Sequence, residues 1–387
     1  MEQGADAVII GAGVVGAACA YFLSAAGASV TVVDRGWVAG GTSGAGEGNI
    51  LVSDKELGPE LELALLSNRL WRELGDTLGE AIELELKGGL IVAGSDQASG
   101  VMAALAERQR EHGVEAVPVP AEGLADLEPN ISRELRGGVS YPQDMQVQPM
   151  LAAAHLLAAA RQMGARLCLG QEVTSVLRGR DGAVQGVTTS KGSLSARVVV
   201  NAAGTWSGEI ARLAGVELPI HPRRGFILVT EPLPLAIRRK VYTAEYVANV
   251  ASGAESLQTS TVVEGTRSGT VLIGATRERA AFDRTISWEA IARLAAGAVE
   301  VFPFLAEVRA LRTYFGFRPY CPDHLPVIGA DPRVPGLIHA CGHEGAGVGL
   351  APATGWLVAR VARGSATEIP LDPFAPNRFD EMLADVR

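Results

Sequence analysis

The sequence of 387 residues has few cysteines, few aromatic residues and no excess of basic residues. Its four cysteines form no CxxC pair and no short Cys/His pairing, which argues against a zinc ribbon, an iron–sulfur cluster and a disulfide framework. Lysine and arginine number 34 against 43 acidic residues, so the net charge of −9 disfavours a nucleic-acid partner. Glycine is abundant instead, with 46 residues, which suits close approaches between backbone and a ligand.

The first long uncharged segment looks at first like a membrane span. No charge occurs between Asp6 and Asp34, and about 20 apolar residues suffice to cross a bilayer. The start of the chain is acidic, however, whereas a signal peptide begins with basic residues. The pattern also changes from a β-prone run at 7–10 to an alanine-rich helix at 14–26 and a β-branched run at 29–33. We therefore predict a β–turn–α–β unit, no transmembrane segment and a cytoplasmic protein.

The turn of this unit carries a dinucleotide fingerprint. The GxGxxG motif follows a predicted strand and opens a helix, and an acidic residue ends the next strand. Gly11 permits the tight turn, Gly13 lets a pyrophosphate approach the backbone, and Gly16 allows close helix packing. Asp34 would bind ribose hydroxyls, and the helix N-terminus would face the phosphates. The residues predicted to bind the dinucleotide here are Gly11, Gly13, Val14, Val15, Gly16, Asp34 and Arg35.

A second loop of small residues, at 40–50, follows directly after this acidic residue. A nicotinamide-binding domain usually continues to its next helix, whereas FAD is longer and needs further N–H and O–H donors. The loop therefore favours FAD, although an ordinary surface loop is an alternative. Its predicted cofactor residues are Gly41, Thr42, Ser43, Glu47 and Gly48.

The remaining pattern predicts an α/β protein with two domains. Helices are expected at 59–78, 97–113, 150–163, 211–215 and 288–301, and the proline-containing stretch 117–129 is expected to be a connector. Strand-like runs recur between 219 and 317, which indicates a mainly antiparallel substrate domain. We predict a Rossmann-like FAD-binding domain formed by 1–87, 146–218 and 316–387, and a substrate domain formed by 88–145 and 219–315.

Four further blocks carry a family resemblance: 201–204 (NAAG), 316–323 (GFRPYCPD), 325–329 (LPVIG) and 342–355 (GHEGAGVGLAPATG). With the two N-terminal loops, they occur in the order typical of the FAD-dependent D-amino-acid oxidase superfamily. The chain resembles its glycine oxidase and sarcosine oxidase branch over almost its whole length. It looks closest to the catalytic β subunits of dye-linked proline or hydroxyproline dehydrogenases and to opine oxidases.

The resemblance implies cofactor contacts beyond the fingerprint. Val173 would face the adenine through its backbone, and the 342–349 segment would pass beside the flavin ring. A helix from about Leu350 would direct its positive end at the flavin. The further residues expected to bind FAD are Val173, Ala202, Ala203, Gly204, Gly342, His343, Gly345, Gly347, Val348 and Gly349.

The resemblance also implies the catalytic residues. Arg318 matches the arginine that holds the substrate carboxylate, and a planar guanidinium suits bidentate binding of this group. His343 and Glu344 could influence protonation of the amine, or His343 could simply cap the helix or pack on the flavin. Tyr242 and Tyr246 lie on the substrate side and could form part of a lid.

Two positions depart from the family pattern. Gly316 stands where monomeric sarcosine oxidases have a flavin-linked cysteine, so we expect non-covalent FAD, with Cys321 as a weaker alternative attachment point. Gly345 stands where glycine oxidases have an arginine, and Glu344 precedes it. The pocket has thereby lost a cation and gained an acid, which argues against glycine oxidase itself.

The resemblance predicts oxidation of a C–N bond in an amino acid or secondary amine carboxylate by hydride transfer to flavin N5. The chain would work as a dehydrogenase subunit, with a second flavoprotein and an iron–sulfur subunit as partners. The alternatives are a single-chain oxidase that uses O₂, an NAD-dependent dehydrogenase and a non-catalytic flavin-holding subunit. No metal site is expected.

Overall fold

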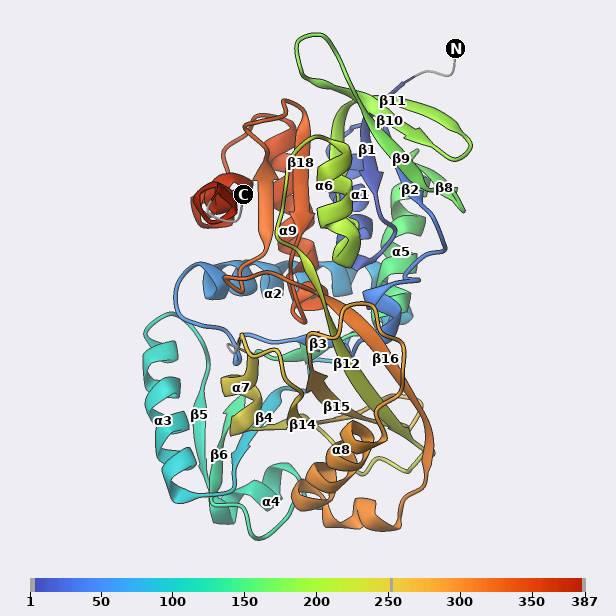
Figure 1. The fold of residues 1–387 in the computed structure, drawn as a ribbon. Helices are drawn as coiled ribbons and strands as arrows, with labels where there is room; N and C mark the ends of the chain where they lie inside the picture. Colours follow the sequence, from blue (N-terminus) through green and yellow to red (C-terminus); the bar gives the residue numbers. More distant parts are fainter. Residues whose placement is uncertain (1–3, 251–252, 385–387) are drawn as a thin grey trace.

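The computed structural model describes residues 4–250 and 253–384, and two large β-sheets divide it into two halves (Figure 1). The first sheet has the order β17-β18-β11-β1-β2-β8, with the hairpin β9–β10 attached to β11. Its strands are β1 (Ala5–Ile10), β2 (Val30–Asp34), β8 (Arg166–Leu169), β9 (Val173–Arg178), β10 (Val184–Thr189), β11 (Gly192–Asn201), β17 (Val327–Ala330) and β18 (Leu337–Cys341).

Parallel pairing places the functional turns of this half at one edge. β1 pairs in parallel with β2 on one side and with β11 on the other, and β11 pairs in parallel with β18. The carboxyl ends of these strands therefore meet, which is where open α/β sheets bind ligands. Three helices pack together in this half, with α1 (Val14–Ala25) in contact with α5 (Pro149–Gln162) and α9 (Gly347–Ala362).

The second sheet has the order β16-β12-β15-β14-β13-β4-β6-β5, and all its pairs are antiparallel except β13–β4. This confirms the predicted α/β class with a mainly antiparallel second sheet. Its strands are β4 (Gly89–Ala93), β5 (Val117–Pro120), β6 (Gly137–Tyr141), β12 (His221–Thr230), β13 (Lys240–Thr243), β14 (Gln258–Gly265), β15 (Val271–Arg277) and β16 (Ala310–Tyr320).

Shorter elements complete the chain. The second half carries α3 (Asp96–Arg110), α4 (Leu124–Leu127), α7 (Ala244–Val250) and α8 (Trp288–Val301) (Figure 1). The others are α2 (Pro59–Leu78), α6 (Ser207–Leu213), α10 (Asp380–Ala384), the pair β3 (Asn49–Ile50) and β7 (Met145–Gln146), and the 3₁₀ turns η1 (Thr42–Ala45), η2 (Gly79–Ile82), η3 (Ala121–Gly123), η4 (Gly204–Trp206), η5 (Pro303–Glu307), η6 (Asp372–Phe374) and η7 (Pro376–Phe379).

The helices predicted at 59–78 and 288–301 have the same bounds in the structure, as α2 and α8. The predicted connector at 117–129 was wrong in part, because it contains β5. This strand lies at the edge of its sheet, where its prolines remove no ladder hydrogen bond. The proposed domain boundary at 316 falls inside β16, which pairs with β12 as far as Tyr320.

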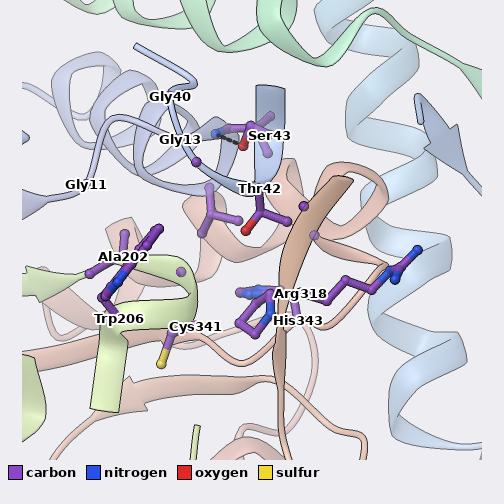
Figure 2. Close-up of a pocket in the computed structure, with 18 of the residues that line it drawn as sticks. Gly11, Gly13, Gly40, Thr42, Ser43, Ala202, Trp206, Arg318, Cys341 and His343 are labelled. Atoms are coloured by element: carbon purple, nitrogen blue, oxygen red, sulfur yellow. Dashed lines mark hydrogen bonds between the residues drawn. The ribbon is translucent and has the colours of Figure 1, made fainter. Parts of the chain in front are cut away.

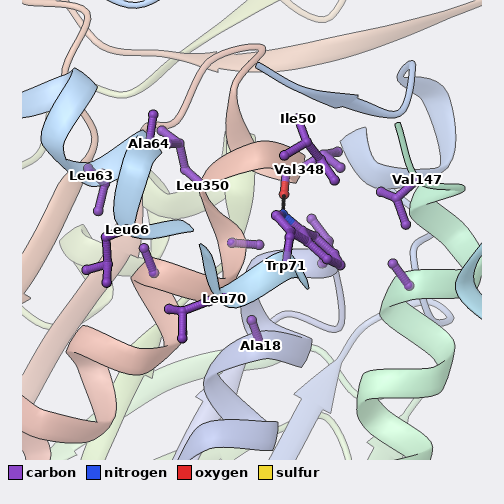
Figure 3. Close-up of a cluster of buried hydrophobic side chains, with 14 of the residues drawn as sticks. Ala18, Ile50, Leu63, Ala64, Leu66, Leu70, Trp71, Val147, Val348 and Leu350 are labelled. Carbon is purple, nitrogen blue, oxygen red and sulfur yellow. Dashed lines mark hydrogen bonds between the residues drawn. The ribbon is translucent and has the colours of Figure 1, made fainter. Parts of the chain in front are cut away.

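Helix α2 lies at the junction of the two halves and packs against α9 (Figure 1). The fully buried side chain of Trp71 lies in this interface, and its indole N–H donates to the carbonyls of Val348 and Gly349, each at 3.1 Å (Figure 3). The same hydrophobic cluster includes Ile9 of the first sheet and Ile91 of the second. A side chain of the hydrophobic core therefore fixes the start of α9 through these hydrogen bonds. Among the residues that the structure describes, no helix has the length and apolarity to cross a membrane.

Candidate active site

A large cavity lies where the carboxyl ends of the first sheet meet the second sheet (Figure 2). Its volume is about 790 Å³, within the range of about 300–1,000 Å³ typical of ligand and cofactor sites. It brings together most of the predicted site residues: Gly11, Gly13, Val14, Val15, Asp34, Arg35, Gly41, Thr42, Ser43, Glu47, Val173, Ala202, Ala203, Gly204, Tyr246, Arg318, His343, Glu344, Gly345, Gly347 and Val348.

Close backbone packing explains the fingerprint glycines at one end of this cavity. Gly11 has φ of +113°, and a Cβ there would lie 2.3 Å from the carbonyl oxygen of Ala202. A Cβ on Gly16 would lie 2.0 Å from the carbonyl oxygen of Gly11. The turn therefore excludes larger side chains, and it leaves the first turn of α1 open to a phosphate.

The acidic residue of the fingerprint lies at the same turn. The Asp34 carboxylate accepts from the backbone N–H of Ala12 at 2.8 Å and from that of Gly36 at 2.7 Å. These two bonds fix the carboxylate beside the turn, where its remaining lone pairs can accept from ribose hydroxyls.

The second small-residue loop joins this turn to the second sheet (Figure 2). The Ser43 hydroxyl oxygen accepts from the backbone N–H of Val14 at 3.0 Å, and the Thr42 hydroxyl donates to the carbonyl of Phe317 at 2.6 Å. Phe317 directly precedes Arg318 in β16. The loop is therefore part of the cavity wall, as predicted, and not a separate surface loop.

The N-terminus of α9 also opens into the cavity. This helix begins at Gly347, three residues before the predicted start, and its first two residues line the cavity with His343 and Gly345. No side chain caps its first turn in the described structure. Its free N–H groups therefore present positive partial charge to whatever occupies the cavity.

Arg318 reaches the cavity from β16, at the end remote from the fingerprint. Its Nη1 donates to the carbonyl of Thr276 at 2.8 Å. Glycines make room for it, since a Cβ on Gly225 would lie 2.0 Å from Nη1 and one on Gly345 would lie 3.4 Å from Nε. Burial and the nearby Arg277 cation lower the pKa of Arg318 to about 10. The side chain stays cationic at neutral pH and keeps donors for a carboxylate.

His343 and Glu344 have protein partners. Burial lowers the pKa of His343 to about 3, and its Nε2 lies 2.9 Å from the hydroxyl of Thr354 in α9. The ring is therefore neutral near pH 7. The Glu344 carboxylate lies 3.3 Å from Nη1 of the buried Arg223 and 2.9 Å from Nδ1 of His324. His343 therefore packs against α9 without capping its first turn, and Glu344 contacts protein cations.

Tyr246 and Glu47 are buried beside Arg318. Burial raises the pKa of Tyr246 to about 12, and its ring stacks edge-on against Tyr242 at 5.4 Å. Burial also raises the pKa of Glu47, against the opposing effect of Lys240 and Arg318. The Oε1 atom of Glu47 has no hydrogen-bond partner within the described chain. An unpaired buried carboxyl oxygen suits contact with a bound cofactor or substrate.

Four glycines predicted to bind the cofactor do not line the cavity: Gly16, Gly48, Gly342 and Gly349. Their roles are in packing. A Cβ on Gly48 would lie 1.8 Å from the carbonyl oxygen of Val147, and Gly342 has φ of +75°. The carbonyl of Gly349 accepts from the hydroxyl of Ser67 at 2.6 Å.

Sequence reasoning missed several residues of the cavity, notably Arg277, Trp206, Gly225 and Cys341. Arg277 lies at the end of β15, and no motif in the sequence marked it as a site residue. Trp206 follows the NAAG block, and the Cζ atom of Arg35 lies 4.3 Å from the centroid of its ring. The NAAG block ends two residues before Trp206, so an examination of the residues that follow this block could have identified Trp206.

The thiols near the cavity agree with non-covalent binding of FAD. Burial raises the pKa of Cys341 to about 12 and raises that of Cys321 as well, which keeps both thiols protonated and unreactive. Cys321 does not line the cavity. Gly316 does, and a Cβ there would lie 2.7 Å from that of Ala45.

Comparisons with known proteins show the family of the chain. The family model "DAO: FAD dependent oxidoreductase" matches residues 6–361. The chain is 33% identical to the hydrogen cyanide synthase subunit HcnC of Pseudomonas aeruginosa, with 100% of this chain and 99% of that protein covered. It is 30% identical to the glycine oxidase of Geobacillus kaustophilus, with 96% and 97% covered.

Solved structures show the same fold. The structure of Geobacillus kaustophilus glycine oxidase superposes with a TM-score of 0.88 at 26% identity, covering 97% of this chain and 99% of that one. The structure of L-proline dehydrogenase from P. horikoshii superposes with a TM-score of 0.89 at 24% identity, covering 99% of both. The chain belongs to the FAD-dependent oxidoreductase family that includes the glycine oxidases. It is an FAD-dependent enzyme that acts on amines or amino acids.

The residues present fit this cofactor. The glycine turn leaves backbone room for a pyrophosphate, and Asp34 offers a carboxylate beside it. The uncapped start of α9 presents N–H groups to the flavin end. Gly13 and Ser43 would hold the phosphates, and Gly347 and Val348 would face the flavin.

Proposed function

We propose that the protein oxidises the C–N bond of an amino acid or of a secondary amine that bears a carboxylate. The observation that carries the proposal is the buried, cationic Arg318 in the same cavity as the dinucleotide fingerprint. When bound, FAD would supply the acceptor for a hydride at its N5 atom.

The reaction balances without a metal or a protein nucleophile. The Cα–H bond would break and its electron pair leave as hydride to the bound cofactor, while the lone pair of the neutral amine forms the C=N bond of an iminium ion. This ion would lose its N–H proton to solvent to give the imine. The chain's part is to bind and orient. Arg318 would hold the carboxylate through the donors that Thr276 does not use, which would fix Cα beside the flavin.

Other residues would shape the charge and access of this site. Tyr246 would close the cavity from α7, and the N-terminus of α9 would stabilise negative charge that develops near the flavin. Glu47 would accept a hydrogen bond from the amine through its buried, unpaired Oε1 atom. His343, held neutral by burial, would position the 343–348 segment without taking part in proton transfer.

We further propose that the chain is a dehydrogenase subunit that passes electrons to a partner flavoprotein. The support is that a relative matched over its full length, HcnC, is a subunit of hydrogen cyanide synthase. The second candidate is a single-chain oxidase that uses O₂. It is favoured by the relatives that are glycine oxidases, matched over nearly the same span.

An anaerobic titration of the purified flavoprotein tests the proposal. The panel would contain D- and L-proline, 4-hydroxyproline isomers, sarcosine, glycine, D-alanine and an opine. We expect one of these classes to bleach the oxidised flavin band, and Arg318→Lys to weaken this effect for carboxylate-bearing amines. Admission of air then separates the candidates, since rapid reoxidation identifies an oxidase and slow reoxidation a dehydrogenase. Flavin that no amine reduces would contradict the proposal.

A further inference from the structure

A second buried arginine, Arg277, lies in the same cavity as Arg318 and forms no ion pair with a described residue. Arg277 is 4% exposed, lies at the end of β15 and lines the cavity. Its guanidinium packs over the ring of Tyr246, with Cζ 4.8 Å from the centroid. Its Nη1 atom is buried and has no hydrogen-bond partner among the described residues.

Two neighbouring arginines in β12, unlike Arg277 and Arg318, form ion pairs with carboxylates. Arg223 in β12 forms an ion pair with Glu344 at 3.3 Å. Arg224 pairs with Glu278 at 2.8 Å and with Asp283 at 2.7 Å. A buried cation without a counterion is costly, and a contact with an aromatic face offsets this cost in part only. An unpaired guanidinium N–H in a cavity therefore points to an anion that binds there.

The acids Glu344 and Glu47 line this end of the cavity, and among the described residues neither forms an ion pair with Arg318 or Arg277. Glu344 contacts Arg223 and His324. Glu47 is buried with a raised pKa and lies near Lys240, which itself pairs with Glu264. Arg318 and Arg277 therefore leave an excess of positive charge for the ligand to neutralise, and they act on each other as like charges.

We infer that Arg277 is a second anion-binding residue and that the substrate is an amine with two carboxylates. Arg318 would hold the carboxylate next to the oxidised carbon, and Arg277 would hold the other one. This inference rests on the proposed function and deepens it by naming the substrate class. Both an N-carboxyalkyl amino acid and an acidic amino acid have this chemistry. The bonds made and broken are those of the proposed reaction, with the second carboxylate unchanged.

The test uses the FAD-loaded protein and ligands that cannot be oxidised. Acetate, propionate and butyrate are compared with malonate, succinate and glutarate by their perturbation of the flavin spectrum. A charged hydrogen-bonded contact changes affinity on the order of 10- to 100-fold. We expect the wild-type protein to prefer at least one dicarboxylate by a factor in this range. Equal binding of both series would overturn the inference.

Three variants assign the preference to one residue. Arg277→Met should abolish the preference for dicarboxylates and leave monocarboxylate binding within about twofold, whereas Arg277→Lys should retain part of it. The matched control is Arg279→Met, which removes the same charge two residues further on, outside the cavity, where Arg279 pairs with Glu255 at 2.9 Å. The control should keep the full preference. Equal losses for both ligand series in Arg277→Met would show instead that both arginines hold one carboxylate.

Two readouts separate this inference from other roles of Arg277 and from the proposed function. If Arg277→Met lowers the affinity of the flavin for sulfite without changing ligand preference, Arg277 serves the cofactor and the inference fails. The ligand titrations need no turnover, so a dicarboxylate preference in a protein that no amine reduces would contradict the proposed function alone. N-(carboxymethyl)amino acids and aspartate or glutamate, tried as reductants, then distinguish the two kinds of diacid.

Discussion

Arg318 donates a hydrogen bond of 2.8 Å to the carbonyl of Thr276 across strand β12, which lies between the strands that carry these two residues. This hydrogen bond can pass over β12 because the β12 residue at that point is Gly225, which has no side chain. A Cβ there would lie 2.0 Å from Nη1 of Arg318 and 2.5 Å from the carbonyl oxygen of Thr276. A backbone atom forms one side of this gap, so the guanidinium must move if the gap is filled.

Gly225→Ala should therefore displace the guanidinium of Arg318 without altering the dinucleotide end of the cavity. We expect affinity for carboxylate ligands to fall on the order of tenfold or more, with FAD content unchanged. The measurement is a titration of the flavin spectrum with acetate. The control is Gly100→Ala in α3, where nothing lies within 4 Å of the added methyl group. Unchanged acetate binding in Gly225→Ala would show that Arg318 does not hold the carboxylate.

The hydroxyl of Ser43 takes the place of an N-terminal cap on α1. It accepts from the backbone N–H of Val14, and Gly13, the residue that precedes the helix, has no side chain to do so. Ser43→Ala should lower the free energy of unfolding by about 1 kcal/mol, the usual cost of losing a helix cap. Chemical denaturation of the FAD-free protein measures this. If Ser43 also holds a phosphate, the variant should bind FAD more weakly as well.

Thermal or chemical unfolding that is identical to wild type would contradict the capping role of Ser43. The matched variant is Ser43→Thr, which keeps the hydroxyl and should retain most of the stability. A loss in both variants would indicate a packing defect at the second loop rather than a lost hydrogen bond.

Burial of His343 makes stability depend on pH with a known sign. Its pKa is about 3 in the folded protein, below the ordinary value of 6.5 for an exposed histidine. Below pH 6.5 the unfolded chain takes up a proton that the folded chain does not, so stability falls as the pH falls. The slope from this group approaches about 1.4 kcal/mol per pH unit. Above pH 6.5 the group adds no dependence.

His343→Gln should remove this contribution while the glutamine side chain can still bond the hydroxyl of Thr354. From pH 7.5 to pH 5, we expect the unfolding free energy of the wild type to fall more than that of the variant. The pH profile of flavin reduction should be the same in both proteins between pH 6 and 9. A profile that loses an ionisation in the variant would restore His343 as a proton-transfer residue.

The sequence predicted the parts of the site that depend on contiguous residues. The turn from Gly11 to Gly16 and the acid at Asp34 lie where β1, α1 and β2 must place them, since local spacing sets that geometry. Ser43 was expected near the cofactor from its small-residue loop, but its bond to Val14 depends on how two distant segments meet.

Contacts across the second sheet could not be predicted in this way. The position of Arg277 beside Tyr246 depends on the register of β15, which the strand-like pattern between 219 and 317 does not set. Likewise, the predicted boundary at 316 divides β16, because the family motif around Arg318 belongs to the cofactor site while its backbone pairs with β12. A sequence motif can therefore predict which ligand a segment contacts, but it does not predict the sheet to which the segment belongs.

Glu47 should make the binding of anionic ligands depend on pH. Burial raises its pKa above the ordinary value, and Arg318 is one of the cations that act on it. As the pH rises through this pKa, Glu47 gains negative charge close to the carboxylate site, so the affinity for acetate should fall. Glu47→Gln keeps the shape and removes the charge. Its acetate affinity should vary less with pH than that of the wild type and should exceed it above the pKa of Glu47.

The matched control for this effect is Glu209→Gln, since Glu209 lines the same cavity and is exposed. It should leave the pH dependence of acetate binding unchanged, because solvent screens a charge at an exposed site far more than at a buried one. Parallel titration curves for wild type and Glu47→Gln would contradict the prediction. They would mean that Glu47 keeps one charge state over the whole range, and that Arg318 binds carboxylates in a field that does not change with pH.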